Sequence, residues 1–259
     1  MIALENVSVR LSGASVVDGV SLTVPDRGWT TLIGANGAGK TSLLRAVAGL
    51  VAHTGSIVLD GRESSRLRAP ERGRMVAVVP QSPLLPADMT VTEYVLLGRT
   101  PHLGYLGRAG RRDMQAVDDA IARLELRPLA ARRLDELSGG ERQRAVLARA
   151  IAQEAPILLL DEPTTALDVG RQQEVLELVA ELRAERGFVV LAAMHDLTLA
   201  GQYAESLVLL DAGRVAAEGP ASEVLTEELI ARHYRARVRV ERIGKTPVVL
   251  PAPREVAAR

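Results

Sequence analysis

The residues with the clearest chemical potential lie at positions 34–41, which read Gly-Ala-Asn-Gly-Ala-Gly-Lys-Thr. Glycines let backbone amides converge on an anion, and a helix that begins near Lys40 directs its positive end at the same anion. Lys40 would neutralise phosphate charge, and the Thr41 hydroxyl would ligate Mg²⁺. The segment therefore predicts binding of a nucleotide, ATP with Mg²⁺. The predicted contacts are Gly34, Ala35, Asn36, Gly37, Ala38, Gly39, Lys40, Thr41 and Ser42.

Two adjacent acids, Asp161 and Glu162, follow the apolar run 157–160. The carboxyl ends of parallel strands are where α/β sheets place their ligands. We expect Asp161 to hold the magnesium ion and Glu162 to act as general base on an attacking water. Taken alone, such a pair is more often a solvated strand end. The glycine loop upstream favours the catalytic interpretation.

A third segment, residues 137–143, reads Leu-Ser-Gly-Gly-Glu-Arg-Gln and precedes a predicted helix. Ser138 and Glu141 have the spacing of a capping box, in which each side chain bonds the backbone of the other. The simple interpretation is a helix start and nothing more. However, Gly139 and Gly140 weaken a first helical turn, so the pair makes more sense if a second anion approaches the backbone there.

The elements that must position these residues follow from the apolar patterns. Alternation over 2–9 and 20–24 predicts antiparallel strands at the N-terminus. The continuous apolar runs 157–160 and 188–194, separated by a helical pattern, predict parallel strands that are covered on both faces. Residues from about 86 to 155 predict a helical subdomain inserted in this core. The fold class is α/β with a mixed, largely parallel sheet.

The C-terminal part predicts a hairpin over 206–218, one last amphipathic helix over 222–234, and an extended or loose tail rich in proline. We therefore divide the chain into a domain over 1–235 and a C-terminal extension over 236–259.

Composition excludes several classes of protein. The 259 residues carry 32 basic and 32 acidic side chains, so there is no basic excess of the kind that nucleic-acid binders show. The absence of cysteine excludes disulfides and thiolate metal sites. The longest apolar run, 188–194, is too short to cross a bilayer. A membrane role therefore requires a partner, and no nucleic-acid partner is expected.

In their order and spacing, six motifs resemble the ATP-binding subunit of an ABC transporter over about residues 2–235. The glycine loop and the acidic pair are similar to the family's Walker A and Walker B motifs, and residues 137–143 to its signature sequence. The remaining three are Pro80-Gln81 for the Q-loop, Thr165 to Asp168 for the D-loop, and His195 for the switch histidine. The resemblance implies a core of the P-loop NTPase type.

The resemblance also implies a site shared between two copies. ATP would lie between the Walker A loop of one chain and Ser138, Gly139 and Gly140 of the other, and Asp168 would bridge the copies. Gln81 would contact the γ-phosphate and the magnesium ion, and link the core to the helical subdomain. His195 would hydrogen-bond the γ-phosphate and orient the water.

One feature departs from the family pattern. The family usually stacks an aromatic residue near the end of the first strand on adenine, and this chain has Arg10 or Leu11 there. The first aromatic residue is Trp29, which stands in the wrong strand for that contact. Base recognition is therefore expected to be weaker, or to come from the Arg10 guanidinium or from packing on Leu11.

Residues 90–103 are similar to the importer subgroup that handles iron–siderophores, haem or cobalamin, in the region where the family docks its permease. This implies transmembrane permease subunits, a periplasmic or extracellular substrate-binding protein, dimerisation on ATP binding, and a peripheral location on the cytoplasmic side of the membrane. Three alternatives stay open: the subunit of an exporter, a soluble ABC ATPase outside transport, and a binding module without hydrolysis. Glu162 and His195 argue against the last of these.

Overall fold

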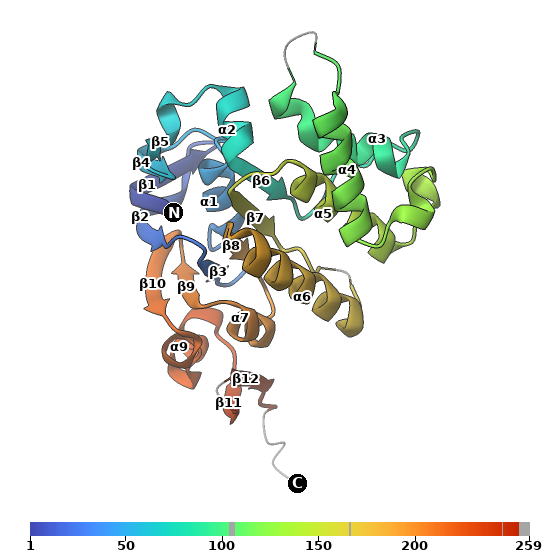
Figure 1. The fold of residues 1–259 in the computed structure, drawn as a ribbon. Helices are drawn as coiled ribbons and strands as arrows, with labels where there is room; N and C mark the ends of the chain where they lie inside the picture. The colour runs from blue at the N-terminus through green and yellow to red at the C-terminus, as the bar shows by residue number, and fades with distance from the viewer. Residues whose placement is uncertain (104–106, 166, 245, 254–259) are drawn as a thin grey trace.

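The computed structural model describes residues 1–103, 107–165, 167–244 and 246–253. Its described strands form a six-stranded sheet, a four-stranded sheet and a two-stranded hairpin. The four-stranded sheet lies at one side of the molecule, and helices α3 and α4 lie at the opposite side (Figure 1). The sheets and the helices between them carry the predicted motifs.

The six-stranded sheet has the order β10-β9-β3-β8-β7-β6. The five strands from β9 to β6 run parallel to one another, and β10 is antiparallel to β9. This confirms the predicted mixed, largely parallel sheet. The strands are β3 (Trp29–Ile33), β6 (Val76–Val79), β7 (Ile157–Asp161), β8 (Val189–Ala193), β9 (Ser206–Asp211) and β10 (Arg214–Gly219).

Both faces of the five parallel strands are buried, which explains why these strands have no polar alternation, whereas β10 at the edge alternates between exposed and half-buried residues. In β7, Leu158 and Leu160 face one hydrophobic core, whereas Ile157 and Leu159 face the other. The first core lies against α5 (Gly139–Ala152) and α6 (Val169–Arg186). The second lies between this sheet and the four-stranded one.

The four-stranded sheet is antiparallel, with the order β2-β1-β4-β5. In β1, Leu4 and Val7 both point into the core although they are an odd number of residues apart. A register shift between them restores the inward direction, and Asn6 takes a φ of 50° at that point. The strands are β1 (Ile2–Leu11), β2 (Ala14–Val24), β4 (Thr54–Leu59) and β5 (Arg62–Glu63).

Helix α1 (Lys40–Val47) lies between the two sheets and packs against β8, β7, β1 and β2. Leu43, Leu44 and Val47 are buried in the second core. The predicted phosphate-binding loop therefore leads from a buried strand directly into a buried helix, and packing on both sides fixes its position.

Helical segments fill the predicted insertion. Thr90 and Glu93 form a capping box at the start of α3, and Ser138 and Glu141 form another at the start of α5. The division into subdomains stays a prediction, and residues 104–106 lie outside the described part. The helical segments of the insertion are α3 (Val91–Leu96), η2 (Leu97–His102), α4 (Arg111–Arg123), η3 (Arg127–Leu129), η4 (Leu134–Glu136) and α5. Two further helical segments, η1 (Ser64–Arg66) and α2 (Ala69–Met75), precede the insertion.

The C-terminal part differs from the prediction in two respects. The single helix expected over 222–234 is two short helices, because Thr226 starts a new helix with its own side-chain cap on the Leu229 amide. The tail is extended, one of the two alternatives expected, but it is also paired as a hairpin, within which Pro247 is tolerated because the two-stranded ribbon has free edges. The elements are α7 (Leu197–Tyr203), α8 (Ala221–Val224), α9 (Glu227–Tyr234), β11 (Val238–Ile243) and β12 (Thr246–Pro251).

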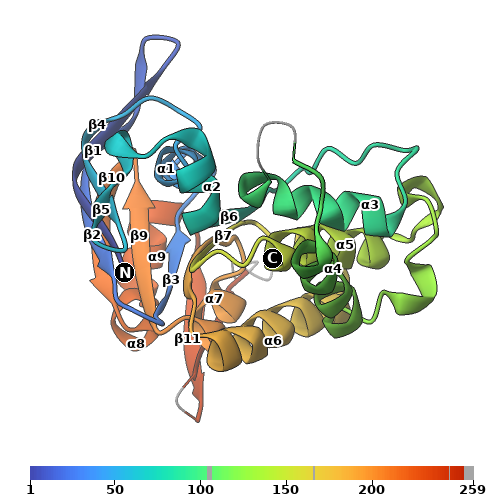
Figure 2. The ribbon, with the colours of Figure 1, turned by 45° about the horizontal axis from the view of Figure 1, so that its top comes forward.

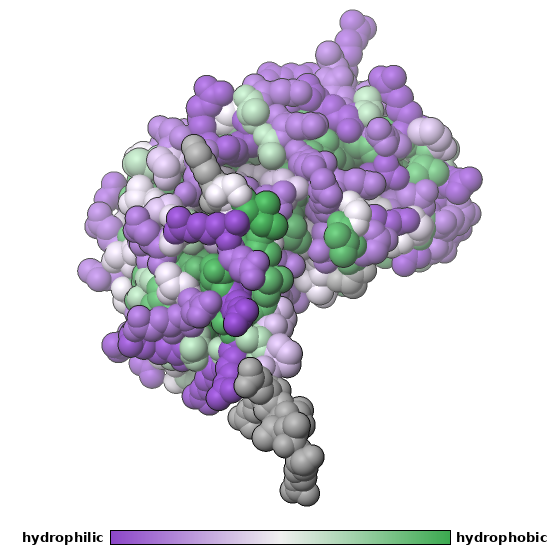
Figure 3. All heavy atoms as spheres, turned by 90° about the horizontal axis from the view of Figure 1, so that it is seen from below, coloured by the Kyte–Doolittle hydropathy of each residue, from purple (hydrophilic) through white to green (hydrophobic). Residues whose placement is uncertain are grey.

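The surface on the side of this hairpin is mostly hydrophilic, with a group of hydrophobic side chains near the centre of the face (Figure 3). Ile243 of β11 is 71% exposed. No helix among the described residues is long and apolar enough to span a bilayer. Residues 245 and 254–259 of the predicted extension lie outside the described part.

Arg99 anchors the helical segments to the end of α5. Its guanidinium, which is 2% exposed, bonds Asp113 at 3.0 Å, Glu154 at 2.8 Å and the Ala152 carbonyl at 2.7 Å. The backbone amide of Gly110 and the Arg99 guanidinium together lower the pKa of Asp113. His102 contacts the Gln153 carbonyl at 2.8 Å. The Arg99 and His102 side chains thus both make structural contacts within the chain.

Replacing Arg99 by Met should lower the free energy of unfolding by about 3 kcal/mol, because the partly buried Asp113 carboxylate loses its counter-charge. Urea denaturation measures this change. Arg123→Met is the matched control: Arg123 pairs with Glu185 at the exposed surface, and its loss should change the free energy by less than about 1 kcal/mol. Equal effects of the two variants would contradict the anchoring role.

Candidate active site

The phosphate-binding loop is built by close backbone contacts that exclude side chains. A Cβ on Gly34 would overlap the Leu210 carbonyl of β9, and a Cβ on Gly39 would overlap the Val16 carbonyl of β2. Both residues have positive φ, 148° and 101°. The loop is therefore held between the two sheets, with the first amides of α1 directed into it.

Lys40 is only 5% exposed and is held by the loop itself. Its Nζ donates to the carbonyls of Gly34 at 2.7 Å and Ala35 at 3.2 Å. Burial lowers the pKa of the ammonium group, and the nearby Glu162 and Asp161 carboxylates partly oppose this by raising it. A cation in this position is ready to pair with an anion that enters the loop.

Thr41 and Asp161 join the loop helix to the end of β7. The Thr41 hydroxyl donates to Oδ1 of Asp161 at 2.8 Å. Burial raises the pKa of Asp161, and the Thr41 hydrogen bond lowers it in part. Two oxygen ligands of the kind that Mg²⁺ prefers therefore lie together beside Lys40.

Glu162 lies at the centre of a polar cluster and is 7% exposed. Its Oε1 contacts Nε2 of His195, and its Oε2 accepts from the Gln81 amide and, at 3.3 Å, from the Thr165 hydroxyl. Its φ of 51° is unusual for a residue other than glycine, and its amide is fixed to the Ala193 carbonyl at 2.9 Å. Strained conformations of this kind concentrate at functional sites.

These residues share one cavity of about 190 Å³. It is lined by Val16 and by the predicted residues Asn36, Gly37, Ala38, Gly39, Lys40, Thr41, Ser42, Glu162 and His195. Gln81 and Asp161 contact its walls through their bonds to Glu162 and Thr41. The structure thus brings together the motifs predicted from residues 34–42, 81, 161–162 and 195.

On the side where adenine was expected to bind, the structure places small and aliphatic groups. Val16 lines the cavity, Leu11 is 38% exposed, and the Arg10 guanidinium donates to the Gly13 carbonyl at 3.3 Å. None of these three residues is aromatic, so they offer the base no aromatic ring to stack on.

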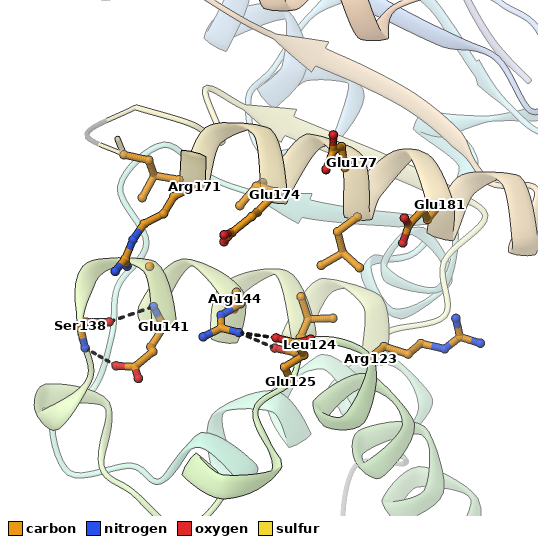
Figure 4. Close-up of a pocket in the computed structure, with 14 residues that line it drawn as sticks. Arg123, Leu124, Glu125, Ser138, Glu141, Arg144, Arg171, Glu174, Glu177 and Glu181 are labelled. Atoms are coloured by element: carbon orange, nitrogen blue, oxygen red, sulfur yellow. Dashed lines mark hydrogen bonds and ion pairs between the residues drawn. The ribbon is translucent and has the colours of Figure 1, made fainter. Parts of the chain in front are cut away.

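The predicted signature segment lies away from this cavity, on a second cleft of about 580 Å³. Figure 4 shows that cleft between the start of α5, the end of α4 and helix α6. Ser138 accepts from the Glu141 amide, and Glu141 accepts from the Ser138 amide at 2.7 Å, as the capping box predicted. In the part of the chain that the structure describes, nothing outside its own helical turn lies within 4 Å of a Cβ placed on Gly139. Within one chain, then, Ser138 and Gly140 line a cleft separate from that of Lys40.

The segment from Pro163 to Asp168 connects the two sites. Gln143 of the signature helix donates to the Pro163 carbonyl at 2.7 Å, and Gln172 donates to the Leu167 carbonyl at 3.1 Å. Asp168 caps α6 by accepting from the Arg171 amide at 3.0 Å. Ala166 of the predicted D-loop lies outside the described residues.

Val16 and Arg171 are among the residues of these sites that the sequence did not predict, and Thr165 was predicted only as part of the D-loop, without its hydroxyl bond to Glu162. Thr165 had a local signal, since a hydroxyl three residues after an acid can bond back to it across a turn. Val16 and Arg171 had none, because only the tertiary fold places them against the loop and the signature segment.

Residues 17–165 match the family model described as ABC transporter. The chain is 38% identical over 254 residues to the ferric enterobactin transport ATP-binding protein of Escherichia coli, covering 96% of this chain and 93% of that protein. It is 44% identical over 246 residues to the hemin import ATP-binding protein of Streptomyces coelicolor, covering 95% and 87%. The chain belongs to the ABC transporter family.

Solved structures agree with this assignment. A metal-chelate type ABC transporter in an inward-facing conformation matches with a TM-score of 0.84 at 25% identity, over 98% of both chains. A dimeric bacterial ABC transporter cassette matches with a TM-score of 0.75 at 27% identity, over 85% of this chain and 99% of that one. The predicted fold class and the ABC-type ATPase activity are thereby confirmed.

Replacing Lys40 by Ala should weaken ATP binding more than tenfold, because a charge-assisted bond to phosphate contributes about 1.5–3 kcal/mol. Titration calorimetry with ATP measures this loss. Lys40→Arg is the control, since it keeps the charge but changes its geometry. Its ATP affinity should lie between those of the wild type and the alanine variant. Unchanged affinity in the alanine variant would refute the assignment of the loop.

Proposed function

We propose that the chain is the ATP-hydrolysing subunit of an importer for a metal-chelate compound, an iron–siderophore, haem or cobalamin. Transport would occur through a separate membrane permease. The observation that most supports ATP hydrolysis is that the phosphate loop, Glu162 and His195 line one cavity. The import names of the relatives favour this cargo class over the exporter and non-transport alternatives.

Glu162 is the proposed general base. It accepts a proton from water as the water oxygen attacks the γ-phosphorus, and the bond from that phosphorus to the bridging oxygen of ADP breaks. In this structure both Glu162 oxygens already have partners, among them Gln81 and His195. We infer that the γ-phosphate takes over these two side chains, which leaves Glu162 to the water.

Lys40 and the loop amides would neutralise the charge that develops on the phosphate oxygens. Lys40 must exchange its carbonyl partners Gly34 and Ala35 for phosphate oxygens, and its burial makes that exchange favourable. The amides of residues 34–42 would fix the β-phosphate between the sheets.

The ligands beside the loop fit Mg²⁺. The Thr41 hydroxyl and the Asp161 carboxylate are in direct contact, and hard oxygen ligands suit this ion. Thr41 and Asp161, with Gln81, would hold the ion, which supplies charge neutralisation between the β- and γ-phosphates. The raised pKa of Asp161 would fall when the positive ion binds.

Two copies are required because the signature segment lies on a different cleft from the loop. Ser138, Gly139 and Gly140 of one chain would contact the γ-phosphate held by the other, and Asp168 would bridge the copies. The open space at Gly139 supports this contact, since no described residue outside its own helical turn lies within 4 Å of a Cβ built there. The dimeric cassette among the matching structures also supports it.

The proposed partners are transmembrane permease subunits and, through them, a periplasmic or extracellular substrate-binding protein. The chain would then be peripheral on the cytoplasmic side of the membrane, where ATP is available. The proposed docking contact lies near the Q-loop, where Leu84 is 90% exposed just after Gln81.

Glu162→Gln should retain ATP binding but lower the rate of hydrolysis by about 100-fold or more, because the amide cannot accept the proton. Phosphate release gives the rate, and sedimentation with ATP should show a persistent dimer. Turnover near that of the wild type would exclude Glu162 as the base.

The same variant tests the cargo class in cells. In a strain that lacks the native gene, the wild-type chain should restore uptake of one labelled compound among an iron–siderophore, haem and cobalamin, and Glu162→Gln should restore none. If uptake of all three is independent of the chain, the cargo proposal is wrong, whereas the ATPase assignment stands.

A further inference from the structure

The cleft that holds the signature segment has an arginine that none of the family motifs includes. Arg171 extends from the first turn of α6 toward the start of α5, where Ser138 and Gly140 lie (Figure 4). The helices α5 and α6 lie side by side in this region in Figure 2. Arg171 therefore approaches the signature turn from the core side of the same chain.

The guanidinium takes the place that a side chain at residue 140 would occupy. A Cβ on Gly140 would overlap Nη1 of Arg171 and would lie 2.9 Å from its Cζ and 3.1 Å from its Cδ. In contrast, among the described residues nothing outside its own helical turn lies within 4 Å of a Cβ built on Gly139. The two signature glycines thus differ: Gly139 is open to a partner, whereas Gly140 lies against the Arg171 guanidinium.

Asp168 fixes the other end of this contact. Its Oδ1 accepts from the Arg171 backbone amide at 3.0 Å, and its Oδ2 pairs with Nε of the Arg171 side chain at 3.3 Å. Both carboxylate oxygens therefore hold Arg171. The Arg171 side chain thus lies between the D-loop carboxylate and Gly140 of the signature turn.

Side-chain hydrogen bonds on both sides support this connection. Gln143, one turn after Gly140, donates to the Pro163 carbonyl, and Gln172 donates to the carbonyls of Thr164 and Leu167. These bonds tie the segment before Asp168 to the helices on both sides. A change in the position of Asp168 would therefore be transmitted to the signature turn through Arg171.

We propose that Arg171 is a positioning residue for hydrolysis at the partner's nucleotide: it holds the Ser138–Gly140 turn to Asp168 so that the turn meets the γ-phosphate on the other chain. This inference rests on the proposed two-chain site. It assigns Arg171 to the half of the site that acts in trans, although the residue lies outside the signature segment.

A surface ion pair without function is the simpler interpretation. Arg171 and Asp168 are 45% and 69% exposed, and pairs this exposed contribute little to stability. That interpretation predicts no effect on turnover. It also gives no reason for the guanidinium to lie against Gly140.

Arg171→Ala should lower kcat for ATP hydrolysis by about tenfold, since a small displacement of a positioning contact has effects of this size or larger. ATP affinity of the isolated chain, measured by calorimetry, should be unchanged, because Arg171 does not line the cavity of Lys40. When Arg171→Ala is added to Glu162→Gln chains, formation of the ATP-dependent dimer should require a higher ATP concentration than with Glu162→Gln alone. Arg171→Lys should restore only part of the rate, because a lysine ammonium does not reproduce the planar guanidinium that lies against Gly140.

Mixing experiments test on which nucleotide Arg171 acts. Arg171→Ala chains mixed with Glu162→Gln chains should regain hydrolysis, because each mixed dimer has one intact site. Arg171→Ala mixed with Ser138→Arg should regain none, because both changes affect the signature half and every site is defective. Ser138→Arg mixed with Glu162→Gln is the positive control for the two-chain site itself.

Arg123→Ala is the matched control, since Arg123 lines the same cleft but pairs with Glu185 and lies away from the signature turn. It should keep the wild-type kcat. Equal kcat values for Arg171→Ala and the wild type would overturn the inference, as would rescue of Arg171→Ala by Ser138→Arg. Failure of the positive control would instead refute the two-chain site.

Discussion

The buried positive charge at the start of α1 is the constraint on which the other contacts depend. Lys40 is almost inaccessible to water, and its ammonium bonds only carbonyl oxygens among the described residues. Such a charge is stable in the interior only with an anion nearby. Asp161 and Glu162 supply negative charge at the ends of the adjacent strands, which raises the Lys40 pKa against the effect of burial. The parallel sheet, the glycine loop and the acidic pair are thus parts of one electrostatic arrangement that a triphosphate would complete.

The second constraint is that the loop and the signature segment of one chain face different clefts. The loop cavity and the signature cleft are separate, and Gly139 faces open space. The segment from Pro163 to Asp168 links them, since it follows Glu162 at one end and holds Arg171 at the other. Hydrolysis on one chain would thereby depend on how the partner's signature turn is held.

Local patterns predicted the residues that lie close in the sequence. The glycine loop, the capping box at Ser138 and the buried strand before Asp161 each have their own signal in composition and spacing. Contacts across the fold had none: Arg171 against Gly140 is fixed only when α5 and α6 pack together. The ion pairs of Arg99 also had no local signal. Arg99 lies within the predicted docking segment, and its side chain is buried between Asp113 and Glu154. The break at Thr226 was missed because apolar periodicity continues through it, whereas the cap on Leu229 decides the boundary.

Cross-linking tests the two-chain site most directly, and the chain has no cysteine to interfere. One chain would carry Asn36→Cys, at the exposed edge of the loop, and the other Gly139→Cys, at the open position of the signature turn. A short bifunctional thiol reagent should join the two chains only when ATP is present, with Glu162→Gln in both chains to prevent turnover. Cross-linking that is equally efficient without nucleotide, or no cross-linking between chains with ATP, would contradict the account.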